Sequence, residues 1–405
     1  MNMDMGATEY TRPNIVDAGP KAAHWIFTLC LLFLLPSLNC CLVFADRTNY
    51  SLILQSVITL YSVCEVSFLS FPDGDGVENI TSSVLGGIIL GMNILSLSLN
   101  FILRKQGQGK IKQWIGYLHR TLSFALVLAG WVKVCLAPVA LFGFCRPGHT
   151  GQCAAHGIMG SAFVWYGFVY SLVLVVPWIR KSDYSQDHID SWVMCLWGIV
   201  NTFTEHRWGR EDWFMHDYQH TAMGIIWWSG GILGIFLSRK GKRTFVPSLL
   251  IIFTGWAMSQ HHQHLEISTH VHAFFGMVLM LGGALRIIEI TFLLKDANNT
   301  NDEILSFQYL STFCLVSSGI LFMGATEEQL KLVMRLGADH SAYILVLLSG
   351  ACLLFCWIQV CLNFYVYLMD TKGTRLDDYE SLYQEFTQSP IADTDVTETS
   401  ESFEL

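Results

Sequence analysis

Charged residues are scarce in this sequence of 405 residues, at 14% against 52% hydrophobic residues. An ordinary soluble domain carries about 25% charged residues, so the composition excludes a typical soluble protein. Long apolar runs, such as 84–103, 157–177 and 271–294, reach the roughly 20 residues that a helix needs to cross a bilayer. Backbone groups in lipid must be hydrogen-bonded internally, so the predicted fold is an all-α, polytopic transmembrane bundle.

Two other features are missing. No stretch interleaves basic with aromatic residues, which argues against nucleic-acid binding and leaves the lipid bilayer as the expected partner. The first apolar run is preceded by a polar start without a basic n-region or an A-x-A site, so no cleavable signal peptide is predicted. The net charge of −9 lies mostly in the segment from Asp370 onward, and the rest of the chain is nearly neutral.

The apolar runs predict about eleven spans, near 23–44, 51–71, 84–103, 115–140, 156–178, 191–205, 218–238, 246–260, 270–294, 305–323 and 340–368. Lys and Arg concentrate in alternate short loops, which favours an outside N-terminus and a cytosolic C-terminus. The expected organisation is an extracytoplasmic segment (1–22), a four-helix region (23–144), a seven-helix, His-rich region (145–368) and an acidic, disordered cytosolic tail (369–405).

Short motifs agree with this topology. Asn79 lies in an Asn-Ile-Thr glycan acceptor within a predicted outer loop. Cys145 and Cys153 bracket another outer loop, where they form either a disulfide or two free thiols. Tyr379-Glu-Ser-Leu382 in the tail matches a sorting signal that adaptors would bind, and a merely solvated tail is the alternative. These signals favour the plasma membrane or the endomembrane and vacuolar system.

Histidines crowd one predicted face of the membrane. The stretch His261–His272 alone holds five histidines and one glutamate, and eleven of the 14 histidines fall on the outer side. The candidate metal ligands are His156, His206, His216, His220, His264, His270 and His272, together with Glu205 and Glu266. Such groups suit a transition metal (zinc, iron or copper) or, through axial imidazoles, haem b. Histidines also collect at membrane interfaces without a ligand, which is the simpler interpretation of any one of them.

Spacing separates some of these histidines. His216 and His220 are four residues apart, so a helix would place both on one face. His270 and His272 are two residues apart, so a helix would point them to different sides.

Charges within predicted spans are the remaining signal. Glu65 and Lys133 have similar predicted depth and are expected to pair, because isolated charges in lipid are costly. The pair belongs either to an ion or proton pathway or to the structure alone. Arg286 and Glu289 lie near the inner end of the ninth predicted span, where they are expected to snorkel or to pair.

Long stretches of the chain resemble a known family. The segments WIGYLHRTLSFALVLAGWVKV, GHTGQCAAHGIMGSAFVWYGF, TEHRWGREDWFMHDYQHTAMGIIWW and HHQHLEISTHVHAFFG together resemble the fungal Ytp family of multi-pass membrane proteins. The family implies the membrane class but no particular activity. The first four spans are also distantly similar to the dihaem cytochrome b ferrireductases, whose four helices each present a histidine. Here His24 and His119 occupy such positions, but each lacks its partner, and Gln55 is the nearest polar residue on the second span.

The leading hypothesis is an integral membrane protein with a His-rich outer site for a transition metal or haem and a redox or metal-handling role. The alternatives are a metal-ion or proton transporter, a metal-dependent membrane hydrolase with Glu205 or Glu266 as general base, and a structural or sorting protein. No nucleophile motif supports the hydrolase, so enzyme activity stays open. Substrate and oligomeric state are not predicted.

Overall fold

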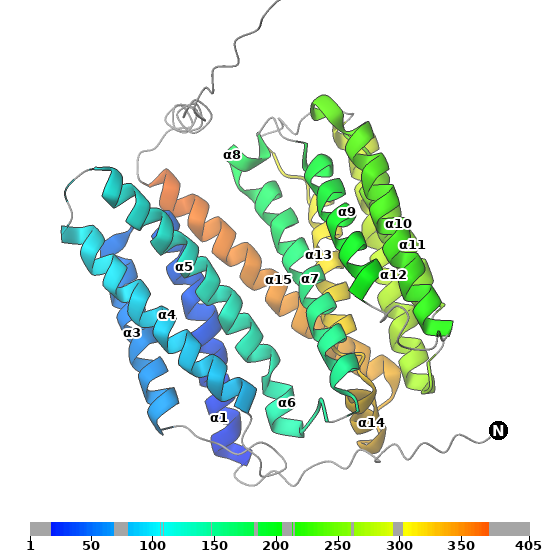
Figure 1. Ribbon diagram of the computed structural model, residues 1–405, viewed down its shortest axis with the longest axis horizontal. Helices are drawn as coiled ribbons and strands as arrows, with labels where there is room; N and C mark the ends of the chain where they lie inside the picture. The colour runs from blue at the N-terminus through cyan, green and yellow to red at the C-terminus, as the bar shows by residue number, and fades with distance from the viewer. Residues whose placement is uncertain are drawn as a thin grey trace, which may run out of the picture.

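The computed structural model describes residues 18–68, 80–105, 107, 109–146, 148–181, 185–204, 213, 215–260, 263–294 and 303–371. In this part of the chain every regular element is a helix, as the long apolar runs predict. Helices run side by side in two groups, with the last helix between them (Figure 1).

The N-terminal group is a bundle of four spans. Its helices are α1 (Ala18–Thr28), which continues through the π-helical η1 (Leu29–Leu34) into α2 (Leu35–Phe44), then α3 (Thr48–Phe68), α4 (Ile80–Lys105) and α5 (Lys110–Cys135). One apolar residue from each span meets at the centre of the bundle: Leu32, Ile58, Ile89 and Leu126. The bundle therefore has a core of its own.

The C-terminal group holds more helices. Its long members are α7 (Thr150–Val175), α9 (Gln186–Thr204), α10 (Met215–Leu237), α11 (Val246–Ser259), α12 (Glu266–Ile288) with the π-helical η3 (Glu289–Leu294), and α13 (Gln308–Met323). Short connections are α6 (Ala137–Phe142), α8 (Pro177–Arg180), η2 (Arg239–Gly241) and α14 (Glu327–Arg335). Glycines let these helices approach closely: a Cβ on Gly160 of α7 would lie 2.7 Å from the Gly319 oxygen of α13.

The last helix, α15 (His340–Asp370), joins the two groups. Asp339 caps its first turn by accepting a hydrogen bond from the Ala342 amide. Farther along, Trp357 donates to Ser37 of α2 over 2.9 Å. Gln359 donates to Ser171 of α7 over 3.2 Å. These bonds attach both groups to the same helix, which runs between them in Figure 1.

Fewer helices than predicted are long and apolar enough to cross a membrane. Among the described residues eight qualify, or nine if α13 and α14, which are bent by 77°, form one broken span. Each of the eleven predicted spans coincides with a helix, but α11 has only 14 residues, and α9 carries Asp187 and Asp190 in its first two turns. An all-α polytopic bundle is thus established, while the count of eleven and the orientation stay predictions.

Candidate functional site

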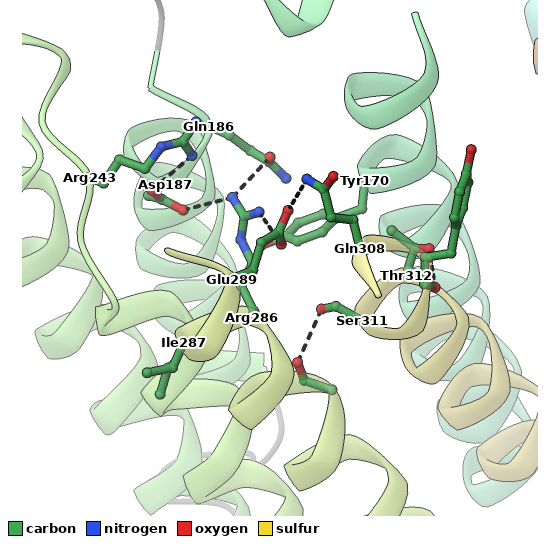
Figure 2. A network of polar contacts seen from close by, with 12 residues as sticks. Tyr170, Gln186, Asp187, Arg243, Arg286, Ile287, Glu289, Gln308, Ser311 and Thr312 are labelled. Carbon is green, nitrogen blue, oxygen red and sulfur yellow. Dashed lines mark hydrogen bonds and ion pairs between the residues drawn. The ribbon is translucent and has the colours of Figure 1, made fainter. Parts of the chain in front are cut away.

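A buried network of charged side chains lies where α9, α12 and α13 meet, at the end of the bundle that carries α8 (Figure 2). Arg286 on α12 is only 5% exposed and lies at its centre. One guanidinium nitrogen contacts a Glu289 oxygen at 2.6 Å. The other contacts Asp187 at 3.3 Å and Gln186 at 3.2 Å. Arg286 therefore ties the end of α12 to the beginning of α9.

Two more side chains close the network. Arg243, in the connection before α11, contacts the second oxygen of Asp187 at 3.3 Å. Gln308, at the beginning of α13, donates to the second oxygen of Glu289 over 2.9 Å. Two guanidinium groups thus face two carboxylates, and the charges of these four residues balance.

A third carboxylate, Asp190, stands one helical turn farther along α9. It is 3% exposed and accepts a hydrogen bond of 2.8 Å from the Tyr170 hydroxyl. Tyr166, one turn away on α7, donates to the Tyr170 hydroxyl over 3.4 Å. Arg286 lies over the Tyr170 ring, with its central carbon 5.2 Å from the ring centroid. Among the described residues Asp190 has no ion-pair partner within 4.0 Å.

Cavities adjoin the network on two sides. A polar cavity of about 40 Å³ is lined by Arg180, Arg243, Arg286, Gln186 and Glu289 among others. A larger cavity of about 330 Å³ lies between α7, α9, α10 and α11. Its walls are mostly apolar, but Asp190 and Tyr166 both line it. Ile189, Val193 and Trp197 of its lining are exposed, so the third carboxylate faces a space that opens at the surface of the bundle.

The N-terminal bundle contains the charged pair expected from the sequence. Lys133 Nζ lies 3.0 Å from a Glu65 oxygen, and both side chains are 4% exposed. His24 Nε2 lies 3.9 Å from the same oxygen. Lys133 also donates to the Ser82 carbonyl over 2.7 Å. The pair thus joins α3 to α5, with His24 of α1 beside it.

Buried amides fill the middle of the same bundle. Asn39 donates to Gln55 over 2.7 Å, and Gln55 donates to Asn93 over 2.8 Å. Asn93 in turn donates to Ser62 over 2.9 Å. Gln55 is fully buried. This chain of hydrogen bonds joins α2, α3 and α4 inside the bundle.

His119 lies at the other end of that bundle. It lines a polar cavity of about 620 Å³ together with Asp46, Arg104, Lys112 and Arg120. Its Nε2 atom is buried and has no hydrogen-bond partner among the described residues. His24 and His119 thus lie at different places in the fold, and among the described residues that line the cavity of His119 there is no second histidine.

Among the histidines predicted to lie on the outer side, two lie together in the interior of the fold. The rings of His156 on α7 and His272 on α12 are 5.8 Å apart, edge to face, and both residues are buried. In each ring Nδ1 lies 2.9 Å from the backbone carbonyl four residues earlier. A carbonyl only accepts hydrogen bonds, so Nδ1 carries the proton and Nε2 presents a lone pair. His220 on α10 is near enough to His156 to interact with it electrostatically.

The neighbouring histidines point elsewhere, as their spacing predicts. The His270 side chain is 47% exposed and lies 3.9 Å from Glu266. Its ring stacks on that of His340, with the centroids 4.2 Å apart. His264 and Glu266 are exposed. These residues form a surface group, separate from His156 and His272.

Several predicted residues lie outside the described part of the chain: Asn79, Glu205, His206, Tyr379 and Leu382. His216 lies in α10, but its side chain is outside the description too. Among the described residues no group of three or more His, Cys, Asp or Glu side chains could hold a metal ion. Cys145 and Cys153 are joined as a disulfide.

Sequence reasoning missed most of the charged network. Arg286 and Glu289 were expected only to snorkel or pair, while Asp187, Asp190 and Arg243 were not singled out. A signal existed, because ionisable residues at the same ends of several predicted spans are costly in lipid unless they meet. Only the folded chain brings them together from α9, α12 and the connection before α11.

Fold and site together define an integral, multi-pass membrane protein of all-α architecture. The family described as Protein YTP1-like, C-terminal, matches residues 129–366. Protein YTP1 of Saccharomyces cerevisiae is 60% identical over 392 residues, which cover 93% of this chain and 85% of that protein. The chain therefore belongs to the Ytp1 family.

More distant relatives carry only general names. Uncharacterized membrane protein C3B8.06 of Schizosaccharomyces pombe is 24% identical over 57% of this chain and 56% of its own length. Uncharacterized membrane protein YCR061W of Saccharomyces cerevisiae is 24% identical over 62% of this chain and 44% of its own length. No solved structure matches the chain. Similarity of the first four spans to dihaem cytochromes stays an expectation.

Proposed function

We propose that this membrane protein is a proton transporter in which Asp190 takes up and releases the proton. The observation that carries the proposal is a carboxylate inside a membrane bundle that faces a cavity of about 330 Å³ and has no ion-pair partner among the described residues. Ionisable groups within membrane spans are expensive, and proton relays are one of their recurrent uses.

Charge balance distinguishes Asp190 from its neighbours. Asp187 and Glu289 are each held by a guanidinium group. Their protonation would leave Arg243 or Arg286 buried without a counter-ion, which is costly. Asp190 accepts instead from a neutral tyrosine hydroxyl. It is therefore the carboxylate in this region whose protonation breaks no ion pair.

Polar groups extend from Asp190 in one direction, and the larger, mostly apolar cavity extends from it in the other. Toward the predicted cytosolic end, Tyr170 connects it to Arg286 and to the polar cavity of about 40 Å³. A water needs roughly 10–15 Å³ of such space, so this cavity has room for a few waters. Toward the predicted outer end, the larger cavity extends as far as Met159, less than one helical turn from His156. His156 would accept a proton from outside on Nε2.

Proton flux into liposomes tests the proposal. Purified protein is reconstituted with an internal pH dye, and a potassium diffusion potential set with valinomycin drives protons inward. We expect the interior to acidify faster than in protein-free liposomes. Asp190→Asn keeps the shape of the side chain but cannot ionise, so its flux should fall to the protein-free rate.

Asp370→Asn is the matched control, because it removes an exposed carboxylate at the end of α15, outside the network. It should transport like the unaltered protein. Folding of each variant is checked by size-exclusion chromatography. Equal flux in Asp190→Asn and the unaltered protein, or no flux above the protein-free rate in a folded preparation, would contradict the proposal.

The outer histidines favour a second candidate function, transition-metal binding. His156 Nε2 is buried and has no hydrogen-bond partner among the described residues. The bond from Nδ1 to the Gln152 carbonyl orients the ring as in metal-ligating histidines. Neither His156 nor His272 lines the cavities of about 330 or 620 Å³, so the pair suits an ion better than haem. Further ligands would come from residues such as His206 and His216.

Metal analysis and spectroscopy separate these ligands. Protein purified without chelators is assayed for zinc, iron and copper and for a reducible Soret band. We expect a stoichiometric metal that is lost in His156→Ala/His272→Ala and retained in His270→Ala, whose ring is on the surface. If the double variant keeps its metal, His156 and His272 are not the ligands. A Soret band would point to haem instead of a metal ion.

A further inference from the structure

The cavity of about 330 Å³ has the size and walls of a small-molecule site. Ligand pockets are commonly about 300–1,000 Å³ and mostly apolar, with a few polar groups that fix orientation. Five of its lining residues are aromatic, including Trp165, Trp197 and Trp227. Along α9 the lining runs from Ile189 to Asn201, which corresponds to about 18 Å of helix. The cavity is therefore long enough for an organic molecule.

Most polar groups in its walls already have partners. Trp227 donates to Thr254 over 2.7 Å, and Thr254 donates to the Leu250 carbonyl over 2.8 Å. The Asn201 amide donates to the His220 carbonyl over 3.3 Å. Among the described residues of the lining Asp190 is the one that carries a charge, and its hydrogen bond comes from a neutral hydroxyl. The described walls therefore supply a negative charge and no positive one.

We infer that the cavity binds a lipophilic organic cation, whose charge Asp190 neutralises and whose apolar groups lie against the tryptophans. The inference rests on the proposed function, because the cation and the proton would occupy Asp190 in turn. A neutral apolar molecule would fill the walls but leave the carboxylate uncompensated. A hydrated metal ion would gain little from apolar walls. Indole rings attract organic cations through their faces, which adds to the fit.

Binding of the cation requires Asp190 to be ionised. The charged and titratable groups facing Asp190 are Tyr166 and Tyr170 on α7, Asp187 on α9 and Arg286 on α12. Asp187 and Arg286 are already paired with each other. Lowering the pH protonates Asp190 and should therefore weaken cation binding, whereas a neutral ligand would bind equally at all pH values.

Tetraphenylphosphonium is the probe, and tetraphenylmethane, which has the same shape without the charge, is its control. Binding to the purified full-length protein in detergent is measured by equilibrium dialysis with radiolabelled probe. We expect saturable binding of the cation that weakens at least tenfold in Asp190→Asn and also weakens as the pH is lowered. The Asp370→Asn control should bind like the unaltered protein.

A second variant tests the place of binding. Met223→Trp adds a bulky ring to the cavity wall while leaving Asp190 intact, and it should abolish binding. Equal binding to Asp190→Asn and the unaltered protein, equal binding of tetraphenylmethane, or unchanged binding to Met223→Trp would each overturn the inference. Proton flux is measured without the probe. If protons are transported but the cation does not bind, only the inference about the cation is contradicted. If the cation binds but no protons are transported, only the transport proposal is contradicted.

Discussion

Replacing Arg286 by Met tests whether the charged network stabilises the C-terminal bundle. The substitution keeps the apolar stem but removes the guanidinium group, and its two neighbours are affected differently. Asp187 keeps its contact of 3.3 Å with Arg243. Glu289 keeps only the hydrogen bond of 2.9 Å that its carboxylate accepts from the Gln308 amide. The variant therefore leaves one buried carboxylate, 4% exposed, without a cation.

Removing one partner of a buried ion pair costs about 3–5 kcal/mol, mostly because the other charge remains buried. We expect a loss in this range for Arg286→Met. Adding Glu289→Gln neutralises the stranded carboxylate and keeps a hydrogen-bonding amide in its place. Contacting residues typically couple by about 0.5–3 kcal/mol, so the double variant should recover part of the loss.

Unfolding in mixed detergent micelles, followed by tryptophan fluorescence, measures these differences. Arg239→Met is the matched control, because Arg239 is an exposed arginine at the same end of the bundle, and it should change stability by less than about 0.5 kcal/mol. The reasoning is refuted if Arg286→Met is as stable as the control. It is also refuted if Glu289→Gln lowers the stability of the Arg286→Met protein by as much as it lowers that of the unaltered protein.

Three further predictions concern other parts of the fold. Glu65→Gln should destabilise the N-terminal bundle, and adding Lys133→Met should reverse part of that loss in a double-mutant cycle, because the two charges lie 3.0 Å apart; strictly additive effects would contradict the pair. Gly160→Ala should destabilise the protein, since its Cβ would lie 2.7 Å from a backbone oxygen of α13, whereas Gly157→Ala meets nothing within 4 Å and should be tolerated in the same thermal assay. Removing the Cys145–Cys153 disulfide, whose cysteines are eight residues apart, should cost about 2–3 kcal/mol, and unfolding with and without reductant measures that cost.

The fold class follows from composition because lipid permits few architectures. Long apolar runs must be helical where water is absent, and each predicted span coincides with a helix. Counting spans is harder. A helix such as α11, with 14 residues, is short for a bilayer, and α9 begins with charged residues. Their apolar character reflects contact with other helices as well as with lipid, and sequence alone does not separate these two environments.

Histidine placement was predictable where a helical period decides it. His270 and His272 lie two residues apart, and the structure turns one to the surface and the other inward beside His156. The pairing of His156 with His272 depends instead on how α7 packs against the rest of the bundle. The crowded stretch of histidines therefore gave no means of selecting the two that meet.

The residues of the charged network are inconspicuous in the sequence. Asp187 and Asp190 stand at the beginning of a helix, where carboxylates are ordinary, and Arg286 stands near the end of one, where it is expected to snorkel. Each residue alone has a simple explanation. Their importance arises from their contacts: Arg243 and Arg286 hold Asp187 and Glu289, whereas among the described residues Asp190 has no cation within 4.0 Å. Functional hypotheses for such bundles are therefore best drawn from the contacts of buried charged groups, because an ionised group buried without a counter-ion is costly.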